Sequence, residues 1–345
     1  MPAMKFRNSA IVILAAVALL VCPNQAFAGY GHGGSTNSDP NTNTSGNSDG
    51  KGDISATAGV VYDLSKNGSG ASTGAVTPTS TWTPPACYYA PKYSPDALEA
   101  YLTPIWAADS TGYEWDATQR DRYVNGKPYT DFNKDKAGKG YWWDSYVTPG
   151  REGDPGALDC TKPIFWVDTG DKPPADIPQA VTPEILSQLA YNQIRVPGTK
   201  VTLAPADKTK VNLPTWAWLD AAEFKPVSVT ASVPALGISA TTTATPHSLK
   251  IDPGTSDAVT YPASGVCEFR NGSIGEAYAK GKAGETPPCG VKYLRSSGTG
   301  SYPLKATITW NISWKGTGAT GGPLDDGTFG ATQDVIVQEI QSVNR

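Results

Sequence analysis

The chain has 345 residues, of which 17% are charged, with a formal net charge of −4 and a mean hydropathy of −0.33. This length suits one large or two ordinary domains, and the composition excludes a disordered polyelectrolyte and a membrane bundle. The lack of a basic excess argues against nucleic acid and anionic membranes as partners, because those partners are bound through charge neutralisation.

Residues 1–28 have the pattern of a secretory signal peptide. Lys5 and Arg7 are followed by the apolar run 11–21, and Ala26-Phe27-Ala28 fits the small-x-small cleavage pattern. The run is shorter than the about 20 residues that span a bilayer. We therefore expect a secreted, extracellular protein with no integral membrane segment after processing.

Residues 29–84 are rich in Gly, Ser, Thr, Asn and Asp and have few apolar side chains. Such a segment buries too little surface to offset the entropy lost on ordering. The sequence predicts a disordered leader over this range.

Residues 85–205 are mixed and loop-rich, and two short helices are predicted there. Ser94-Pro95 and Thr182-Pro183 each combine an N-cap residue with proline at the first helical position. We expect a small α+β domain over this range.

From residue 211 the apolar pattern changes to a period of two. Val227 to Val233 alternates apolar and polar residues, and 302–314 does so with seven apolar side chains on one face. Strands separated by Gly, Pro and Asn turns are typical of antiparallel β-sandwiches. The predicted fold class is therefore mainly β with a small α+β part, and residues 211–345 form an antiparallel β-sandwich. Trp310 is predicted to be a core residue of that domain.

Four cysteines remain once Cys22 is removed with the signal peptide. They are Cys87, Cys160, Cys267 and Cys289. An even number in an exported chain predicts disulfides, and four cysteines allow three pairings. Pairing within each half, 87 with 160 and 267 with 289, is the most economical choice.

Two segments carry a resemblance to known proteins. Residues 293–302, followed by the alternating strand from Ala306 to Trp310, resemble the end of a PKD-type immunoglobulin-like module over about residues 227–315. The run 211–218, the 267/289 cysteine pair, 310–314 and 337–344 are similar to uncharacterised secreted proteins of actinobacteria. The resemblance implies a PKD-like C-terminal module and brings no established activity.

Aromatic and acidic residues gather in the middle of the chain. Tyr141, Trp142, Trp143 and Asp144 are candidate ligand residues, because aromatic rings can stack on sugars. The same rings could instead form the core of a small domain.

Further along, Asp168-Thr169-Gly170 has the form of an aspartic-protease loop, but no second copy accompanies it, so a strand ending in a turn is the alternative.

Asp131, Asn133 and Asp135 place oxygen-bearing side chains at alternate positions, as calcium loops do. A structural calcium site is one interpretation, and a solvated polar turn is the other. No other cofactor is expected.

We expect a secreted or cell-surface protein of non-enzymatic, structural or interaction type. One alternative is a cell-wall or carbohydrate-binding protein that uses the aromatic and acidic middle region. A further alternative is a secreted hydrolase, although the chain has only two histidines. The expected partners are cell-wall glycan or another surface protein.

Overall fold

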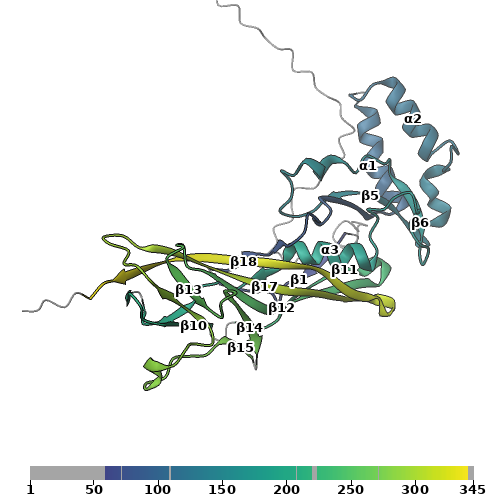
Figure 1. Ribbon diagram of the computed structural model, residues 1–345. Helices are drawn as coiled ribbons and strands as arrows, with labels where there is room; N and C mark the ends of the chain where they lie inside the picture. Colours follow the sequence, from purple (N-terminus) through teal and green to yellow (C-terminus); the bar gives the residue numbers. More distant parts are fainter. Residues whose placement is uncertain are drawn as a thin grey trace, which may run out of the picture. The chain divides into compact units, whose positions relative to one another are not determined.

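The computed structural model describes residues 59–340, except residues 71, 109, 207, 220–223 and 271. The predicted fold class is confirmed, since these residues form a mainly β structure with a large antiparallel sheet and few helices (Figure 1). The predicted signal peptide and residues 29–58 lie outside the described residues. Within the described ranges, no helix is both long and apolar enough to cross a membrane.

The large sheet joins thirteen strands of the described residues in the order β13-β16-β10-β15-β14-β12-β17-β18-β3, with β1, β8, β9 and β11 paired at its sides. Among the strand pairings that the structure describes in this sheet, only that of β9 with β18 is parallel. The strands are β1 (Val61–Asp63), β3 (Thr77–Pro78), β8 (Thr202–Ala204), β9 (Lys208–Lys210), β10 (Thr215–Leu219), β11 (Val227–Val233), β12 (Ile238–Asp252), β13 (Ala258–Tyr261), β14 (Val266–Arg270), β15 (Ser273–Gly275), β16 (Gly290–Tyr293), β17 (Tyr302–Gly316) and β18 (Gly321–Gln338).

Strand β14 makes this sheet continuous. Its residues 266–268 pair with β12, whereas Phe269 and Arg270 pair with β15. The strands are therefore hydrogen-bonded in one path, and the division into the two facing sheets of a sandwich stays a prediction.

The period-two pattern of β17 is reflected directly in its burial. Leu304, Ala306, Ile308 and Trp310 are at 0% exposure, and the residues between them are half-buried or exposed. The predicted core position of Trp310 is confirmed. Strand β11 lies in the same sheet as β17, and the helix α3 (Pro183–Gln193) packs on β11, β12 and β17.

A second, three-stranded sheet is not hydrogen-bonded to the large one among the described strands. It consists of β4 (Cys87–Tyr93), β5 (Gly140–Val147) and β6 (Phe165–Asp168) in that order. The helix α1 (Pro95–Ala107) contacts β4 and β5. Also nearby are α2 (Tyr113–Tyr123) and the 3-10 helix η2 (Asp131–Lys136), which contact each other. The remaining short elements are β2 (Gly74–Ala75), β7 (Arg195–Val196), η3 (Pro155–Leu158), η4 (Pro234–Leu236), η5 (Lys282–Gly284) and η6 (Thr317–Ala319).

Two hydrophobic cores meet at the small sheet. The small core, under α1, consists of Leu98, Leu102, Trp106, Tyr123, Phe132, Trp142 and Ile164. The large core contains Trp143, Leu186, Val229, Trp310 and Val337 among many others. Trp142 and Trp143 belong to different cores because successive side chains of a strand point to opposite faces. The expected boundary near residue 205 does not separate these cores, since α3 covers the large sheet.

The helix starts predicted at Ser94 and Thr182 are confirmed. The Ser94 hydroxyl accepts a hydrogen bond from the Ala97 amide at 3.2 Å, and the Thr182 hydroxyl accepts one from the Ile185 amide at 3.2 Å. Each cap satisfies one of the amides that a helix N-terminus leaves without a partner.

The predicted leader extends too far toward the C-terminus. Strand β1 pairs with β11, β2 with β7, and β3 with β18, so part of the range 59–84 belongs to the fold. Tyr62 and Trp82 pack against the large core and Val76 lies within it. These scattered apolar residues supply the burial that the overall polar composition concealed. We call residues 74–82 the N-terminal strap.

Candidate functional site

Both predicted disulfides are present. Cys87 is bonded to Cys160 with Cα atoms 6.0 Å apart, and Cys267 is bonded to Cys289 with Cα atoms 5.7 Å apart. The first joins β4 to the loop before β6, and the second joins β14 to the residue before β16.

The candidate ligand residues 141–144 lie in the interior. Trp142 and Trp143 are 0% and 1% exposed, Asp144 is 1% exposed, and Tyr141 is half-buried against the large core. Each face of β5 is covered by one of the two cores, so the tryptophan rings cannot stack on a sugar at the surface. The ligand interpretation is corrected for these two rings, and the alternative interpretation as core residues agrees with their burial.

Asp144 forms a buried ion pair that the sequence analysis missed. Lys92 Nζ lies 2.9 Å from Asp144 Oδ2, and the two side chains are 14% and 1% exposed. The register of β4 against β5 shifts between Pro91 and Tyr93, which places Lys92 at a β-bulge. A bulge redirects a side chain. No spacing rule in the sequence links residues 92 and 144.

Tyrosines surround this pair. The ammonium of Lys92 lies 5.5 Å from the ring centre of Tyr93 and 5.1 Å from that of Tyr146. Burial, and then the charge of Asp144, raises the pKa of Tyr93 and of Tyr101. Burial, then Tyr88 and Asp144, raises the pKa of Tyr146. The phenols therefore stay protonated, and the Asp144 charge is compensated within the fold.

The predicted calcium residues lie in η2. Asp131 and Asp135 are exposed, whereas Asn133 is buried. The backbone has positive φ at Asp131, Phe132 and Asn133 (41°, 54° and 56°), and the Phe132 side chain lies in the small core. Asp131 lies 3.4 Å from Lys134 Nζ. Within the described residues no group of three or more His, Cys, Asp or Glu side chains is arranged to hold a metal. Calcium binding by Asp131, Asn133 and Asp135 stays a prediction.

Asp168 is the last residue of β6, and Gly170 follows with a φ of 92°. Its carboxylate accepts a hydrogen bond from Trp166 Nε1 at 2.7 Å and lies 3.5 Å from Lys136 Nζ. The Trp166 hydrogen bond, followed by Lys136, lowers the pKa of Asp168. This arrangement agrees with a strand that ends in a turn.

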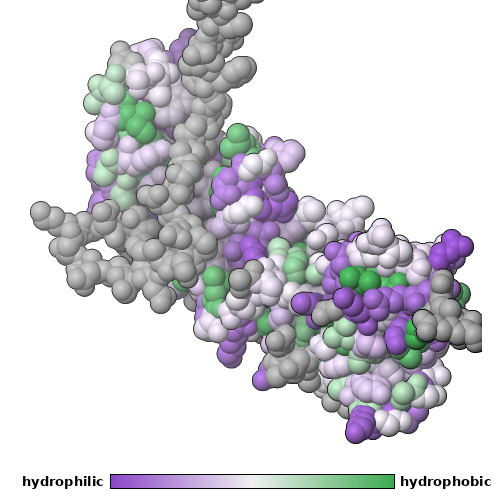
Figure 2. Space-filling view, turned by 90° about the vertical axis from the view of Figure 1, so that its left-hand side faces the viewer, coloured by the Kyte–Doolittle hydropathy of each residue, from purple (hydrophilic) through white to green (hydrophobic). Residues whose placement is uncertain are grey.

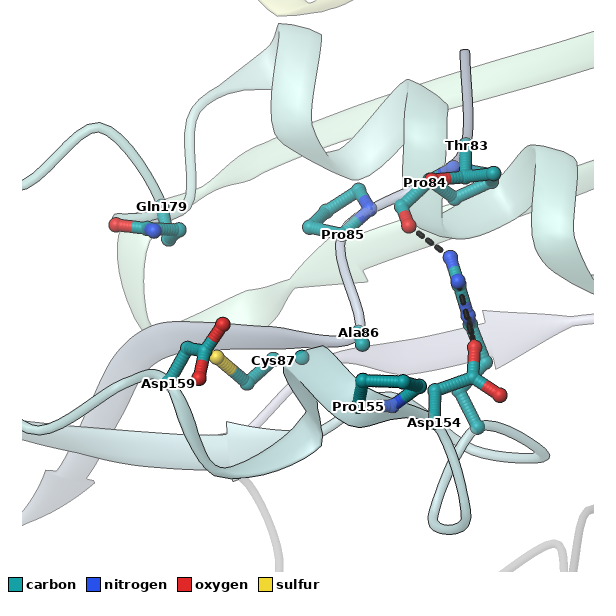
Figure 3. A pocket seen from close by; sticks show the side chains of 11 residues that line it. Thr83, Pro84, Pro85, Ala86, Cys87, Asp154, Pro155, Asp159 and Gln179 are labelled. Atoms are coloured by element: carbon teal, nitrogen blue, oxygen red, sulfur yellow. Dashed lines mark hydrogen bonds and ion pairs between the residues drawn. The ribbon is translucent and has the colours of Figure 1, made fainter. Parts of the chain in front are cut away.

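A surface groove lies beside the Cys87–Cys160 disulfide (Figure 3). Its volume is about 350 Å³, and three prolines and five polar side chains contribute to its lining, namely Pro84, Pro85, Pro155, Thr83, Arg151, Asp154, Asp159 and Gln179. Arg151 Nε donates to Asp154 Oδ2 at 2.6 Å, and Arg151 Nη1 donates to the carbonyl of Pro84. The groove therefore has a fixed ion pair on one side and a further carboxylate, Asp159, among its other lining residues.

The sequence analysis did not single out this groove. Its walls come from residues 83–87, from 151–159 and from Gln179, and the disulfide brings the first two segments together. The predicted pairing of Cys87 with Cys160 was the one feature of the sequence that could have indicated that these two segments lie side by side.

Comparison of the chain with protein family models, with curated proteins and with solved structures finds no match.

Proposed function

We propose that this is a secreted or cell-surface protein of structural or interaction type that binds a partner and catalyses no reaction. Its two disulfides support an extracellular location, because disulfides persist in oxidising compartments and are rare in reducing ones. The proposal also includes that the chain is related to secreted actinobacterial proteins and that its C-terminal part is a PKD-like module.

The groove beside the Cys87–Cys160 disulfide carries the interaction proposal. The loop that forms one wall is fixed at its end by the disulfide and by the contact of Arg151 with Pro84. A rigid scaffold that presents a surface loop is a frequent arrangement for recognition. Leu158, on the same loop, is 81% exposed. Leu158 and the Arg151–Asp154 ion pair lie on one loop, which therefore offers apolar and charged contacts to a protein partner.

The alternative partner is a cell-wall glycan. The groove favours it through polar groups at Arg151, Asp154, Asp159 and Gln179, which could hydrogen-bond to sugar hydroxyls. The burial of Trp142 and Trp143 removes the stacking rings that this alternative first relied on. Figure 2 shows separate small apolar patches on a mostly polar face, so no broad apolar surface on that face favours either partner.

Site-specific photo-crosslinking separates these partners. A photo-reactive amino acid is placed at Leu158, and a matched control carries it at Tyr113, which is 83% exposed on α2. In the producing cells we expect discrete protein adducts from position 158 and none from position 113. Adducts with cell-wall glycan would support the alternative. Equal adducts from both positions, or none, would overturn the proposal that this loop binds a partner.

Export is tested separately on the protein in the culture medium. We expect the mature chain to begin at Gly29 and to contain no thiol that reacts with an alkylating reagent before reduction. Intact mass spectrometry with and without reductant measures both. A chain that retains residues 1–28, or that alkylates without reductant, would contradict the extracellular location. An activity screen on glycans and peptides tests the hydrolase alternative.

A further inference from the structure

A β-bulge in β18 places two aspartates side by side. In the β17–β18 hairpin Trp310 pairs with Gly327 and Ile312 pairs with Leu324. Asp325 and Asp326 therefore both stand opposite the single residue Asn311. Both aspartates are half-buried. A bulge that brings two carboxylates to one point of a strand is a costly arrangement unless their charge is compensated.

The N-terminal strap crosses this bulge. The Ser80 hydroxyl donates a hydrogen bond to the Asp325 carboxylate, and the Thr79 amide donates to the Asp326 carbonyl at 2.8 Å. Strand β3 of the strap pairs with Gly327 and Thr328, directly after the two aspartates. A neutral hydroxyl oxygen is thus held against one of the two carboxylates.

Within the part of the chain that the structure describes, no lysine, arginine or histidine forms an ion pair with Asp325 or Asp326. Among those residues, ten pairs join other side chains. Half-buried carboxylates gain from an opposite charge, since water screens them only in part.

A buried hydroxyl without a partner faces the same point. Tyr191 of α3 is 2% exposed, and its Oη has no hydrogen-bond partner among the described residues. A Cβ added to Gly327 would lie 2.9 Å from this Oη, so the hydroxyl lies against the residue that follows Asp326. Burial, followed by the charges of Asp325 and Asp326, raises the pKa of Tyr191. Buried polar groups are nearly always hydrogen-bonded, and this one is available to a water or an ion.

We propose that Asp325 and Asp326, with the Ser80 hydroxyl, bind a calcium ion, and that the Tyr191 hydroxyl hydrogen-bonds to a water on that ion. The donor set contains only oxygen, which suits a hard cation and excludes a zinc site built on thiolate or imidazole. Calcium takes six to eight oxygen ligands in a flexible geometry, so backbone carbonyls and waters can complete the site. Magnesium requires a regular octahedron and is disfavoured at an irregular bulge. The ion would fasten the N-terminal strap to the sheet.

The test uses the full mature chain after treatment with a chelator. Calcium should raise its melting temperature, because a ligand of the native state stabilises that state by mass action. Magnesium at the same concentration should raise it less. Terbium(III), which replaces calcium and emits when an excited aromatic ring is close, should give luminescence that calcium abolishes. Trp82, whose ring centre lies 5.3 Å from that of Tyr191, is the expected donor.

Variants locate the ion. Asp325→Asn/Asp326→Asn should weaken calcium binding by about a hundredfold or more, because loss of outer-shell partners alone costs about 10- to 100-fold. Tyr191→Phe should weaken it by about tenfold. The matched control, Asp131→Asn/Asp135→Asn, removes two carboxylates at the other candidate loop and should leave the affinity unchanged. Circular dichroism confirms that each variant is folded, and Tyr191→Phe gives a second comparison should the double variant not fold.

Two results would overturn the proposal. One is a calcium response that persists in Asp325→Asn/Asp326→Asn and disappears in Asp131→Asn/Asp135→Asn, which would place the ion at η2. The other is the lack of any melting shift and any terbium luminescence at millimolar concentrations. Both readouts are independent of the binding function proposed for the groove.

Discussion

The small core and the large core use different side chains for the same purpose. Four of the seven buried members of the small core are aromatic, whereas the face of β17 in the large core is mostly aliphatic. In the small core two polar tips have partners: Trp142 Nε1 donates to the Phe132 carbonyl at 2.9 Å, and Tyr123 Oη donates to the Ile164 carbonyl at 3.1 Å. Trp106 Nε1, in the same core, has no partner among the described residues. Trp310 Nε1 in the large core has no partner among the described residues.

This difference shows two ways to fill a core. In the small core a few large rings, held by edge-to-face contacts and by hydrogen bonds, fill a region that has few aliphatic residues. In the large core the long strand β17 supplies an apolar side chain at every second residue, and Trp310 contributes mainly by the volume that its ring fills. The two cores can be compared by measuring the stability lost when a buried ring, a disulfide, a buried charge or a helix cap is removed.

Replacing Trp310 should have the largest effect. Trp310→Ala removes a ring at 0% exposure from the large core and should lower the free energy of unfolding by about 3–5 kcal/mol. Thr309→Ala, on the opposite face of β17, should change it little. Chemical denaturation of both variants measures the difference. A Trp310→Ala protein with wild-type stability would mean that this core does not depend on the ring.

Removing each disulfide in turn should show which region depends more on its cross-link for stability. The Cys87–Cys160 bond spans 73 residues and the Cys267–Cys289 bond spans 22. On the loop-entropy model, serine replacement of the first pair costs about 4 kcal/mol and of the second about 3 kcal/mol. Thermal unfolding of the two double variants tests this order. The reverse order would indicate that the region around the shorter loop depends more on its cross-link.

Removing one partner of the buried ion pair should destabilise the region of the small core. Asp144→Asn leaves the Lys92 ammonium nearly buried without its counter-charge, at a cost of about 3 kcal/mol. The control, Asp121→Asn, breaks an exposed pair with Lys127 and should cost much less, because water screens an exposed pair. Denaturation midpoints distinguish them. Equal midpoints would show that the buried pair contributes no more than a surface pair.

The helix caps should give the smallest effects. Ser94→Ala on α1 and Thr182→Ala on α3 each remove one cap hydrogen bond and should cost about 1 kcal/mol. Hydrogen exchange should show the first loss mainly in α1 and the second in α3 and the strands beneath it. Identical exchange patterns would mean that the two cores open together.

The contrast between the cores also explains what the sequence could predict. Alternation over 302–314 and the Ser-Pro and Thr-Pro starts are local patterns, and each gave a correct element. Helix α2 was missed, because only Asp116 and Tyr123 of its residues are buried and it has almost no apolar face. Trp142 and Trp143 fitted a ligand surface as well as a core, because the same rings serve both and only tertiary cover decides.

The sites depended on contacts that no local pattern contains. The groove needs residues 83–87 beside 151–159, and the Asp325–Asp326 bulge needs the strap and Tyr191. The strap itself was assigned to the leader, since Val76 and Trp82 are isolated among polar residues.

The Cys87–Cys160 bond also determines how the chain would respond to a pulling force. A protein held at its N-terminus transmits tension through the strap to Cys87, and from there the bond carries it directly to Cys160. The 72 residues between them, which include α1, α2 and β5, are bypassed, and about 250 Å of contour length cannot be drawn out while the bond is oxidised. The small core, apart from Ile164, is therefore mechanically shielded, and a single reduction event would make it extensible.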